Sequence, residues 1–172
     1  MARFRSNKIE SSSPDVVRAA ALRMLDRKRY SEKELAQKLR QKGAAMADIQ
    51  AVLEDLRALG LVDDQKLVEA FIHYRQYNAP KGRAYVKREL LEKGVPVELA
   101  EQGIEEYYPP EEEAALLRRL MEKELARRPV EAEKKKKFEQ ALARKMAAKG
   151  FALGTIFALL SELGADCEAL DN

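Results

Sequence analysis

Three Lys-Gly pairs in this sequence, those ending in Gly43, Gly94 and Gly150, are surrounded by residues that follow one register. Apolar residues stand eight and four positions before each glycine and three, six, ten and thirteen positions after it. They are, offset by offset, Leu35, Val86 and Leu142; Leu39, Leu90 and Met146; Met46, Val97 and Leu153; Ile49, Ala100 and Ile156; Leu53, Ile104 and Leu160; and Leu56, Tyr107 and Leu163. Because these spacings follow one face of a helix and glycine readily ends a helix, each pair is predicted to join two amphipathic helices.

A third helix fits before each of these pairs, over roughly residues 14–28, 64–78 and 111–127. Residues typical of helix starts stand there: Pro14 after Ser13, Asp63 and Asp64 after Gly60, and Glu111 to Glu113 after Pro109-Pro110. The middle helix of the first copy begins with a capping box, in which Ser31 is the N-cap and Glu34 lies three residues later. Each copy is therefore predicted to contain three helices.

The sequence thus predicts an all-α fold, since β-branched runs of strand length are missing. Three tandem three-helix repeats are expected to form an elongated, curved body. The predicted segments are a disordered N-terminal segment (1–13), repeats over 14–60, 61–108 and 109–165, and a C-terminal tail (166–172). The alternative is that generic amphipathic helices happen to align; the repeated Lys-Gly pair and the single register for two helices in three copies favour repeats.

Composition limits where such a chain functions. The chain has one cysteine, Cys167, so an internal disulfide is excluded. No apolar run approaches the roughly 20 residues that span a bilayer, and the first thirteen residues lack the apolar stretch of a signal peptide. We expect a soluble cytoplasmic protein that does not contact membranes.

Residues that could support catalysis are few. His73 is the only histidine, and no glycine-rich phosphate loop is present. Asp63 and Asp64 could form an acid-base or metal-binding pair, but helix capping is the simpler interpretation. Tyr107 and Tyr108 could stack on a base, although core packing is favoured at the end of an apolar stripe. We predict no enzyme activity, cofactor, metal or small-molecule substrate.

Charge alternates along the chain in register with the predicted helices. The net charge is +7 over residues 1–42, −4 over 43–71, +4 over 72–93, −7 over 94–117, +7 over 118–149 and −4 over 150–172. Arg83 and Lys87 lie four residues apart, where like charges repel within a helix, so a binding partner could be the reason for them. The basic candidates for contact with a partner are Arg29, Lys33, Arg75, Lys81, Arg83, Lys87, Arg88 and Lys134, Lys135, Lys136 and Lys137. A solvated helical face is the alternative for the last four.

Several segments resemble the RecX family of regulatory proteins. They are Ser31-Glu32-Lys33-Glu34-Leu35, Leu61-Val62-Asp63-Asp64 after Gly60, the stretch from Gly82 to Gly94 (GRAYVKRELLEKG), and Lys149-Gly150-Phe151. The resemblance covers roughly residues 15–165, and the middle stretch is its most specific part. Leu61 departs from the aromatic residue expected before the aspartate pair but has the same apolar character.

The resemblance implies tandem three-helix repeats and a role in DNA repair, homologous recombination and the SOS response. RecX proteins bind the RecA recombinase filament on single-stranded DNA and restrain its ATPase, strand-exchange and coprotease activities. The family's best-known segment matches Arg83, Lys87, Arg88 and Glu89, which are therefore expected to contact RecA or DNA. Two alternatives stay open: a helical DNA-binding module that acts without RecA, and a helical scaffold for an unrelated protein.

Overall fold

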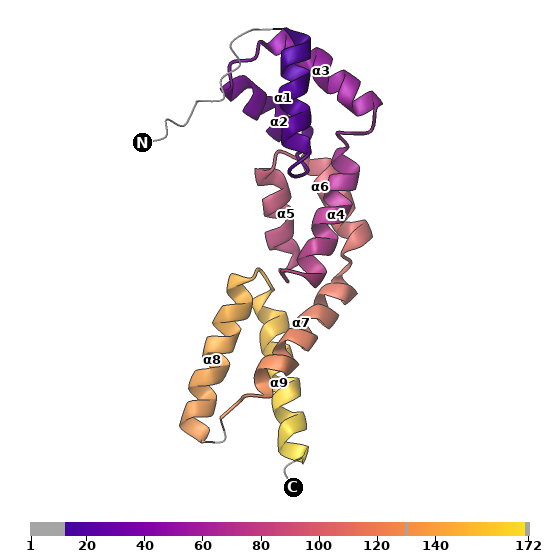
Figure 1. The fold of residues 1–172 in the computed structure, drawn as a ribbon. Helices are drawn as coiled ribbons and strands as arrows, with labels where there is room; N and C mark the ends of the chain where they lie inside the picture. The colour runs from indigo at the N-terminus through magenta and orange to yellow at the C-terminus, as the bar shows by residue number, and fades with distance from the viewer. Residues whose placement is uncertain (1–12, 130, 171–172) are drawn as a thin grey trace, which may run out of the picture. The chain divides into compact units, whose positions relative to one another are not determined.

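The computed structural model describes residues 13–129 and 131–170, and every regular element in this part of the chain is an α-helix (Figure 1). The all-α prediction is therefore confirmed. The helices are α1 (Pro14–Leu25), α2 (Glu32–Gln41), α3 (Met46–Ala58), α4 (Asp64–Tyr77), α5 (Arg83–Glu92), α6 (Val97–Tyr107), α7 (Pro110–Leu125), α8 (Ala132–Ala148) and α9 (Leu153–Leu170). Apart from Ser13, the segment predicted to be disordered (1–13) lies outside the described residues.

The three Lys-Gly pairs end α2, α5 and α8 in the same way. Gly43, Gly94 and Gly150 have φ values of 96°, 84° and 89°, in the left-handed region that favours glycine. The backbone N–H of the next residue donates to the carbonyl five residues earlier, from Ala44 to Leu39 at 3.2 Å, Val95 to Leu90 at 3.1 Å and Phe151 to Met146 at 3.3 Å. These residues are all buried. The three pairs thus form one repeated helix-ending motif with its apolar contact.

Side-chain caps begin two of the helices. The Ser31 hydroxyl accepts the backbone N–H of Glu34 at 3.1 Å, and the Asp63 carboxylate accepts that of Lys66 at 3.0 Å. Asp64, which we expected to cap the same helix as Asp63, instead accepts the backbone N–H of Glu32 at 2.9 Å. Because Asp63 occupies the N-cap position of α4, Asp64 lies in the first turn of that helix, and its carboxylate satisfies the first backbone N–H of α2 beside the Ser31 cap.

By its internal contacts the chain divides into two compact units. Unit 1 contains the described part of residues 1–69 together with 90–100, and unit 2 contains 70–89 together with 101 onward. The division cuts through α4, α5 and α6, so the compact units do not coincide with the predicted repeats.

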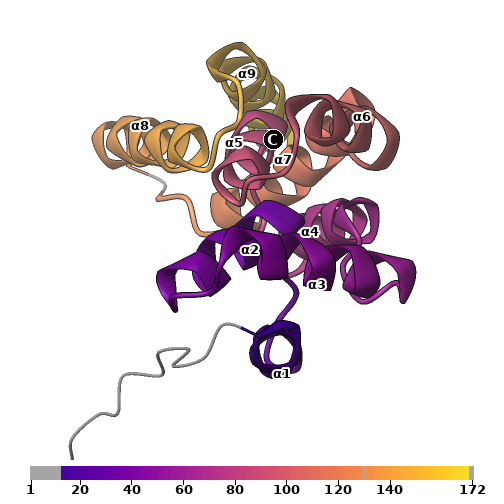
Figure 2. The ribbon, with the colours of Figure 1, turned by 90° about the horizontal axis from the view of Figure 1, so that it is seen from above.

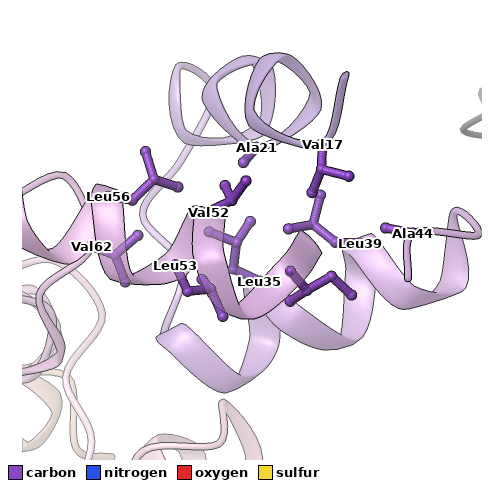
Figure 3. Close-up of a cluster of buried hydrophobic side chains, with 10 residues drawn as sticks. Val17, Ala21, Leu35, Leu39, Ala44, Val52, Leu53, Leu56 and Val62 are labelled. Carbon is purple, nitrogen blue, oxygen red and sulfur yellow. The ribbon is translucent and has the colours of Figure 1, made fainter. Parts of the chain in front are cut away.

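The core of unit 1 is built where α1, α2 and α3 pack on one another. Figure 2 looks along α1, and α2 and α3 lie on the same side of it. Figure 3 shows Val17 and Ala21 of α1 directed at the leucines of α2 and α3. Leu35, Leu39 and Ile49, at the repeat offsets, are fully buried. Each such side chain contributes about 1.5–3 kcal/mol by burial.

The core of unit 2 lies mainly between α7, α8 and α9, which pack on one another. Leu117, Met121, Met146 and Ile156 are fully buried. Tyr108, just before α7, is also buried, and its hydroxyl donates to the carbonyl oxygen of Lys81 at 2.9 Å. The polar end of this large side chain therefore has a partner, and burial raises its pKa.

One kind of junction occurs in each unit, where the start of a middle helix meets a Lys-Gly pair of the following repeat. In unit 1 the buried Ser31 hydroxyl donates to the carbonyl oxygen of Lys93, and a Cβ on Gly94 would lie 3.0 Å from the side chain of Lys33. In unit 2 the N–H of Gly82 donates to the carbonyl oxygen of Lys149 at 2.9 Å. Neither glycine has room for a Cβ, because a Cβ on Gly82 would meet the backbone of Gly150 and a Cβ on Gly150 would meet the Cβ of Tyr85.

The last helix, α9, extends to Leu170 and so reaches into the segment predicted as a tail (166–172). Residues 165–170 (ADCEAL) contain no proline or glycine that would end a helix. Among the described residues, no helix combines the length and apolar character that a membrane span requires.

Candidate functional site

The like-charge pair on α5 has acidic partners on α6, within unit 2. Arg83 forms an ion pair with Glu105, and the Nζ of Lys87 lies 2.7 Å from a carboxylate oxygen of Glu101. The backbone N–H of Arg83 also donates to Glu113 at 2.7 Å. The basic and acidic helices of this repeat therefore face each other here, and each of the two like charges has an internal acidic partner.

Arg75 and Glu89 form a second pair, which joins α4 to α5 in unit 2. The Nη2 of Arg75 lies 2.5 Å from Oε1 of Glu89, and the side chains are only 18% and 17% exposed. The Arg75 guanidinium also stands 5.2 Å from the centre of the Phe71 ring. Both predicted contact residues are thus largely turned inward, and losing either would leave a charge shielded from water.

Two cations lie over the ring of Tyr85 and a third, Lys149, lies near Lys81; we call Lys81, Tyr85, Arg88 and Lys149 the Tyr85 cluster. The Nζ of Lys81 lies 4.1 Å from the ring centre and the Cζ of Arg88 lies 4.7 Å from it. The Nζ of Lys149 donates to the carbonyl oxygen of Pro80 at 3.4 Å. Burial lowers the pKa of Lys149, and the nearby charges of Lys81 and Lys145 lower it further.

Two charges of this cluster, those of Lys81 and Lys149, differ from the paired charges of Arg83 and Lys87. Within residues 13–129 and 131–170, neither Lys81 nor Lys149 forms an ion pair with a carboxylate. Lys145, by contrast, pairs with Glu124 at 2.8 Å. The contact with the Tyr85 ring leaves the positive charge of Lys81 in place. This arrangement suits an anion.

Sequence reasoning selected Lys81 and Arg88 but missed Tyr85 and Lys149. The lysine of each Lys-Gly pair was an available signal, although the pattern predicts only a helix ending from it. The proximity of Lys149 to Lys81, 68 positions away, depends on the junction in which Gly82 meets Lys149. Only the packing of one repeat on the next could show it.

The candidates of the first and third repeats have local contacts. In unit 1, the Arg29 guanidinium approaches the Lys66 carbonyl oxygen at 3.5 Å, and the stem of Lys33 lies against Gly94. In the run of lysines on α8, Lys134 pairs with Glu131 at 2.9 Å and Lys137 with Glu133 at 2.7 Å. Lys135 is partly buried, whereas Lys136 is exposed. The exposed pairs on α8 contribute little to stability.

The residues considered for catalysis have structural partners. His73 lies 3.2 Å from the side chain of Gln76 and stacks against Tyr77. Asp63 and Asp64 accept hydrogen bonds at the starts of two different helices. In the part of the chain that the structure describes, no three His, Cys, Asp or Glu side chains are grouped to hold a metal ion.

Two family models match the chain. Residues 18–56 match the first three-helix domain of RecX, and residues 63–104 match the second. Solved structures show the same fold: a crystal structure of RecX from Lactobacillus salivarius superposes with a TM-score of 0.73 and 22% identity, covering 88% of this chain and 97% of that one. A second, titled regulatory protein RecX, has a TM-score of 0.71 at 20% identity, covering 86% of this chain and 73% of that one.

Curated relatives named regulatory protein RecX match over most of the chain. That of Geobacillus kaustophilus is 36% identical over 86% of this chain and 54% of its own length, so this chain spans about half of that relative. The relative from Geobacillus thermodenitrificans is 33% identical, over 83% of this chain and 52% of its own length. That of Pelodictyon phaeoclathratiforme is 34% identical over 73% of this chain and 77% of its own length. The chain therefore belongs to the RecX family of regulatory proteins.

Proposed function

We propose that this protein binds the RecA recombinase filament on single-stranded DNA in the cytoplasm and restrains its ATPase, strand-exchange and coprotease activities. The observation that carries the proposal is the RecX family membership, which rests on a relative matched over 77% of its length. The protein acts as a regulator by binding and performs no reaction of its own.

The charges in the described chain support a filament as partner. Lys81 and Lys149 of the Tyr85 cluster have no carboxylate partner among the described residues, which suits phosphate, whereas Glu98 and Glu106 of α6 are exposed carboxylates that suit a basic protein surface. A filament of protein on nucleic acid offers both chemistries. Arg29, Lys33 and the lysines from 134 to 137 are further proposed contacts.

The test is a RecA assay with the purified protein added at rising ratio. DNA-dependent ATP hydrolysis and strand exchange should both fall as the ratio increases. Unchanged rates at saturating protein would refute the proposal. Bovine serum albumin at the same mass concentration controls for crowding.

The Tyr85 cluster also favours a second candidate, direct binding of single-stranded DNA without RecA. Two ammonium groups held near each other with no carboxylate partner among the described residues are favourable for a phosphodiester chain. Fluorescence anisotropy with labelled oligo(dT) should then give an affinity that falls linearly with salt on logarithmic axes.

Matched double variants separate the two candidates. Lys81→Gln with Lys149→Gln should lower oligo(dT) affinity and flatten its salt dependence if this cluster binds DNA. Lys28→Gln with Lys66→Gln removes the same charge from lysines that have carboxylate partners, Glu34 and Asp63, and that are not among the proposed contacts. Equal losses in both variants would mean that net charge alone matters, and tight binding only in the presence of RecA and nucleotide would favour the filament.

A further inference from the structure

Exposed leucines gather at one end of unit 1, where α1 ends and α3 is followed by the turn into α4. Leu22 of α1 is 42% exposed and Leu61, just after Gly60, is 49% exposed. Single exposed apolar residues are ordinary on protein surfaces. These two, however, line one open groove of about 650 Å³ together with Leu25, which also packs against the core of α1, α2 and α3. The groove therefore has an apolar surface, and Leu25 connects this surface to the core of unit 1.

The groove is open where a ligand would have to enter. A Cβ placed on Gly60 would meet no atom within 4 Å, so the space above this turn is free among the described residues. Leu59, on the other side of Gly60, is 65% exposed. A volume of this order accommodates a few side chains, and protein pockets of roughly 300–1,000 Å³ commonly bind ligands.

The rim of the groove is basic. Arg23 and Arg29 line it, and their guanidinium groups reach only backbone carbonyl oxygens, of Ala19 at 3.0 Å and of Lys66 at 3.5 Å. Neither forms an ion pair with a carboxylate in the part of the chain that the structure describes. Asp26 is the one acidic residue of the lining, so the rim keeps a net positive charge. Guanidinium forks without carboxylates favour an acidic partner.

We propose that this groove docks a peptide segment of RecA in which a bulky aliphatic side chain lies beside one or two carboxylates. The inference rests on the proposed function and deepens it, because it gives the filament protein a contact that is independent of phosphate. The aliphatic side chain would cover Leu22, Leu25 and Leu61, and the carboxylates would pair with Arg23 and Arg29. Apolar contact surrounded by charge pairs is the usual arrangement at a protein interface.

The test compares affinities for RecA filaments assembled on oligo(dT) with a non-hydrolysable ATP analogue, measured by biolayer interferometry with the full chain. Leu22→Asn with Leu61→Asn should weaken binding about tenfold or more, which is the loss expected for a central apolar contact. Leu153→Asn, at a leucine of α9 that is 56% exposed, is the control and should change affinity less than about twofold.

A second pair of variants tests the rim. Arg23→Gln with Arg29→Gln should weaken binding and reduce its dependence on salt, because two charge pairs would be lost. Arg144→Gln is its control, since this exposed arginine likewise reaches only a backbone carbonyl oxygen among the described residues, that of Gln140. Circular dichroism should show unchanged helicity, as all these side chains are exposed.

The outcomes are distinguishable. Wild-type protein that fails to bind filaments would overturn both the proposed function and the groove. Wild-type binding with an unchanged leucine double variant would overturn the groove alone, as would losses confined to the arginine variant. Wild-type dimerisation that disappears in the leucine double variant, measured by sedimentation velocity, would assign the groove to a second copy of the chain and overturn the RecA segment as its occupant.

Discussion

Gly82 donates its backbone N–H to the carbonyl oxygen of Lys149 at 2.9 Å, which ties the start of α5 to the end of α8 within unit 2. Ser31 and Lys93 have the same relationship in unit 1, except that the serine hydroxyl is the donor. In both units, the residue before a middle helix therefore binds the lysine of the Lys-Gly pair in the following repeat. The motif that ends one helix also joins consecutive repeats.

Replacement of Gly150 by alanine should destabilise the protein more than the same change at Gly60. Both have positive φ, which costs alanine about 1–2 kcal/mol. At Gly60 the new Cβ meets open space, whereas at Gly150 it would lie 2.5 Å from the Cβ of Tyr85. We expect a loss of about 1 kcal/mol for Gly60→Ala and about 2–4 kcal/mol for Gly150→Ala, by urea denaturation. Equal losses would mean that the junction contributes nothing beyond backbone strain.

Ser31→Ala should lower the free energy of unfolding by about 1–3 kcal/mol, because Ser31 caps α2 and also donates to Lys93. Ser31→Gly separates the two roles, since glycine replaces an N-cap serine at a cost of only a few tenths of a kcal/mol. The loss that remains in the glycine variant measures the junction bond. Thermal denaturation followed by circular dichroism gives both values. A glycine variant as stable as wild type would refute a stabilising junction bond.

Reversal of charge at Arg83 and Lys87 (Arg83→Glu with Lys87→Glu) should weaken binding to RecA filaments by about tenfold if these residues contact the partner. The double variant also breaks the pairs with Glu105 and Glu101. Adding Glu105→Arg and Glu101→Lys restores these internal pairs with reversed sign. Affinity measured by interferometry should stay low in the fourfold variant. Recovered affinity would instead assign the residues to internal pairing.

Asp63 and Asp64 should affect stability in opposite ways as pH changes. The hydrogen bond from the backbone N–H of Lys66 lowers the pKa of Asp63. Ionised Asp63 therefore stabilises the fold above its unfolded pKa of 3.8, and this stabilisation is lost as pH falls through the folded pKa. Burial raises the pKa of Asp64, so its ionised form is disfavoured in the fold at neutral pH and this penalty is relieved on acidification through the folded pKa.

The measurement is urea denaturation between pH 3 and pH 7. Relative to wild type, Asp63→Asn should lose more stability at pH 7 than at pH 3. The free energy of unfolding of Asp64→Asn relative to wild type should instead be higher at pH 7 than at pH 3. Parallel pH dependence of the two variants would contradict these assignments. Asn keeps a side-chain oxygen that can accept the hydrogen bond from Lys66 or Glu32, so the comparison isolates charge.

Helix positions were predictable because they depend on residues close together in the sequence. Leu35 and Leu39 lie on one face by spacing alone, and Gly43 ends their helix by its own conformational freedom. The predicted start at residue 64 agrees with α4. It was predictable because an N-cap depends only on the residue before the helix. The end predicted near residue 165 differs from Leu170, since no strong stop signal follows Gly164.

The sequence by itself therefore determined the helices, the Lys-Gly endings and the RecX resemblance, all of which depend on local spacing. Only the tertiary structure decided which charges are neutralised and which are not. Arg83 and Lys81 are equally basic in sequence, yet one has Glu105 beside it and the other Lys149. That difference depends on residues more than 20 positions away, whose approach is set by the packing of helices, and helical periodicity contains no information about it.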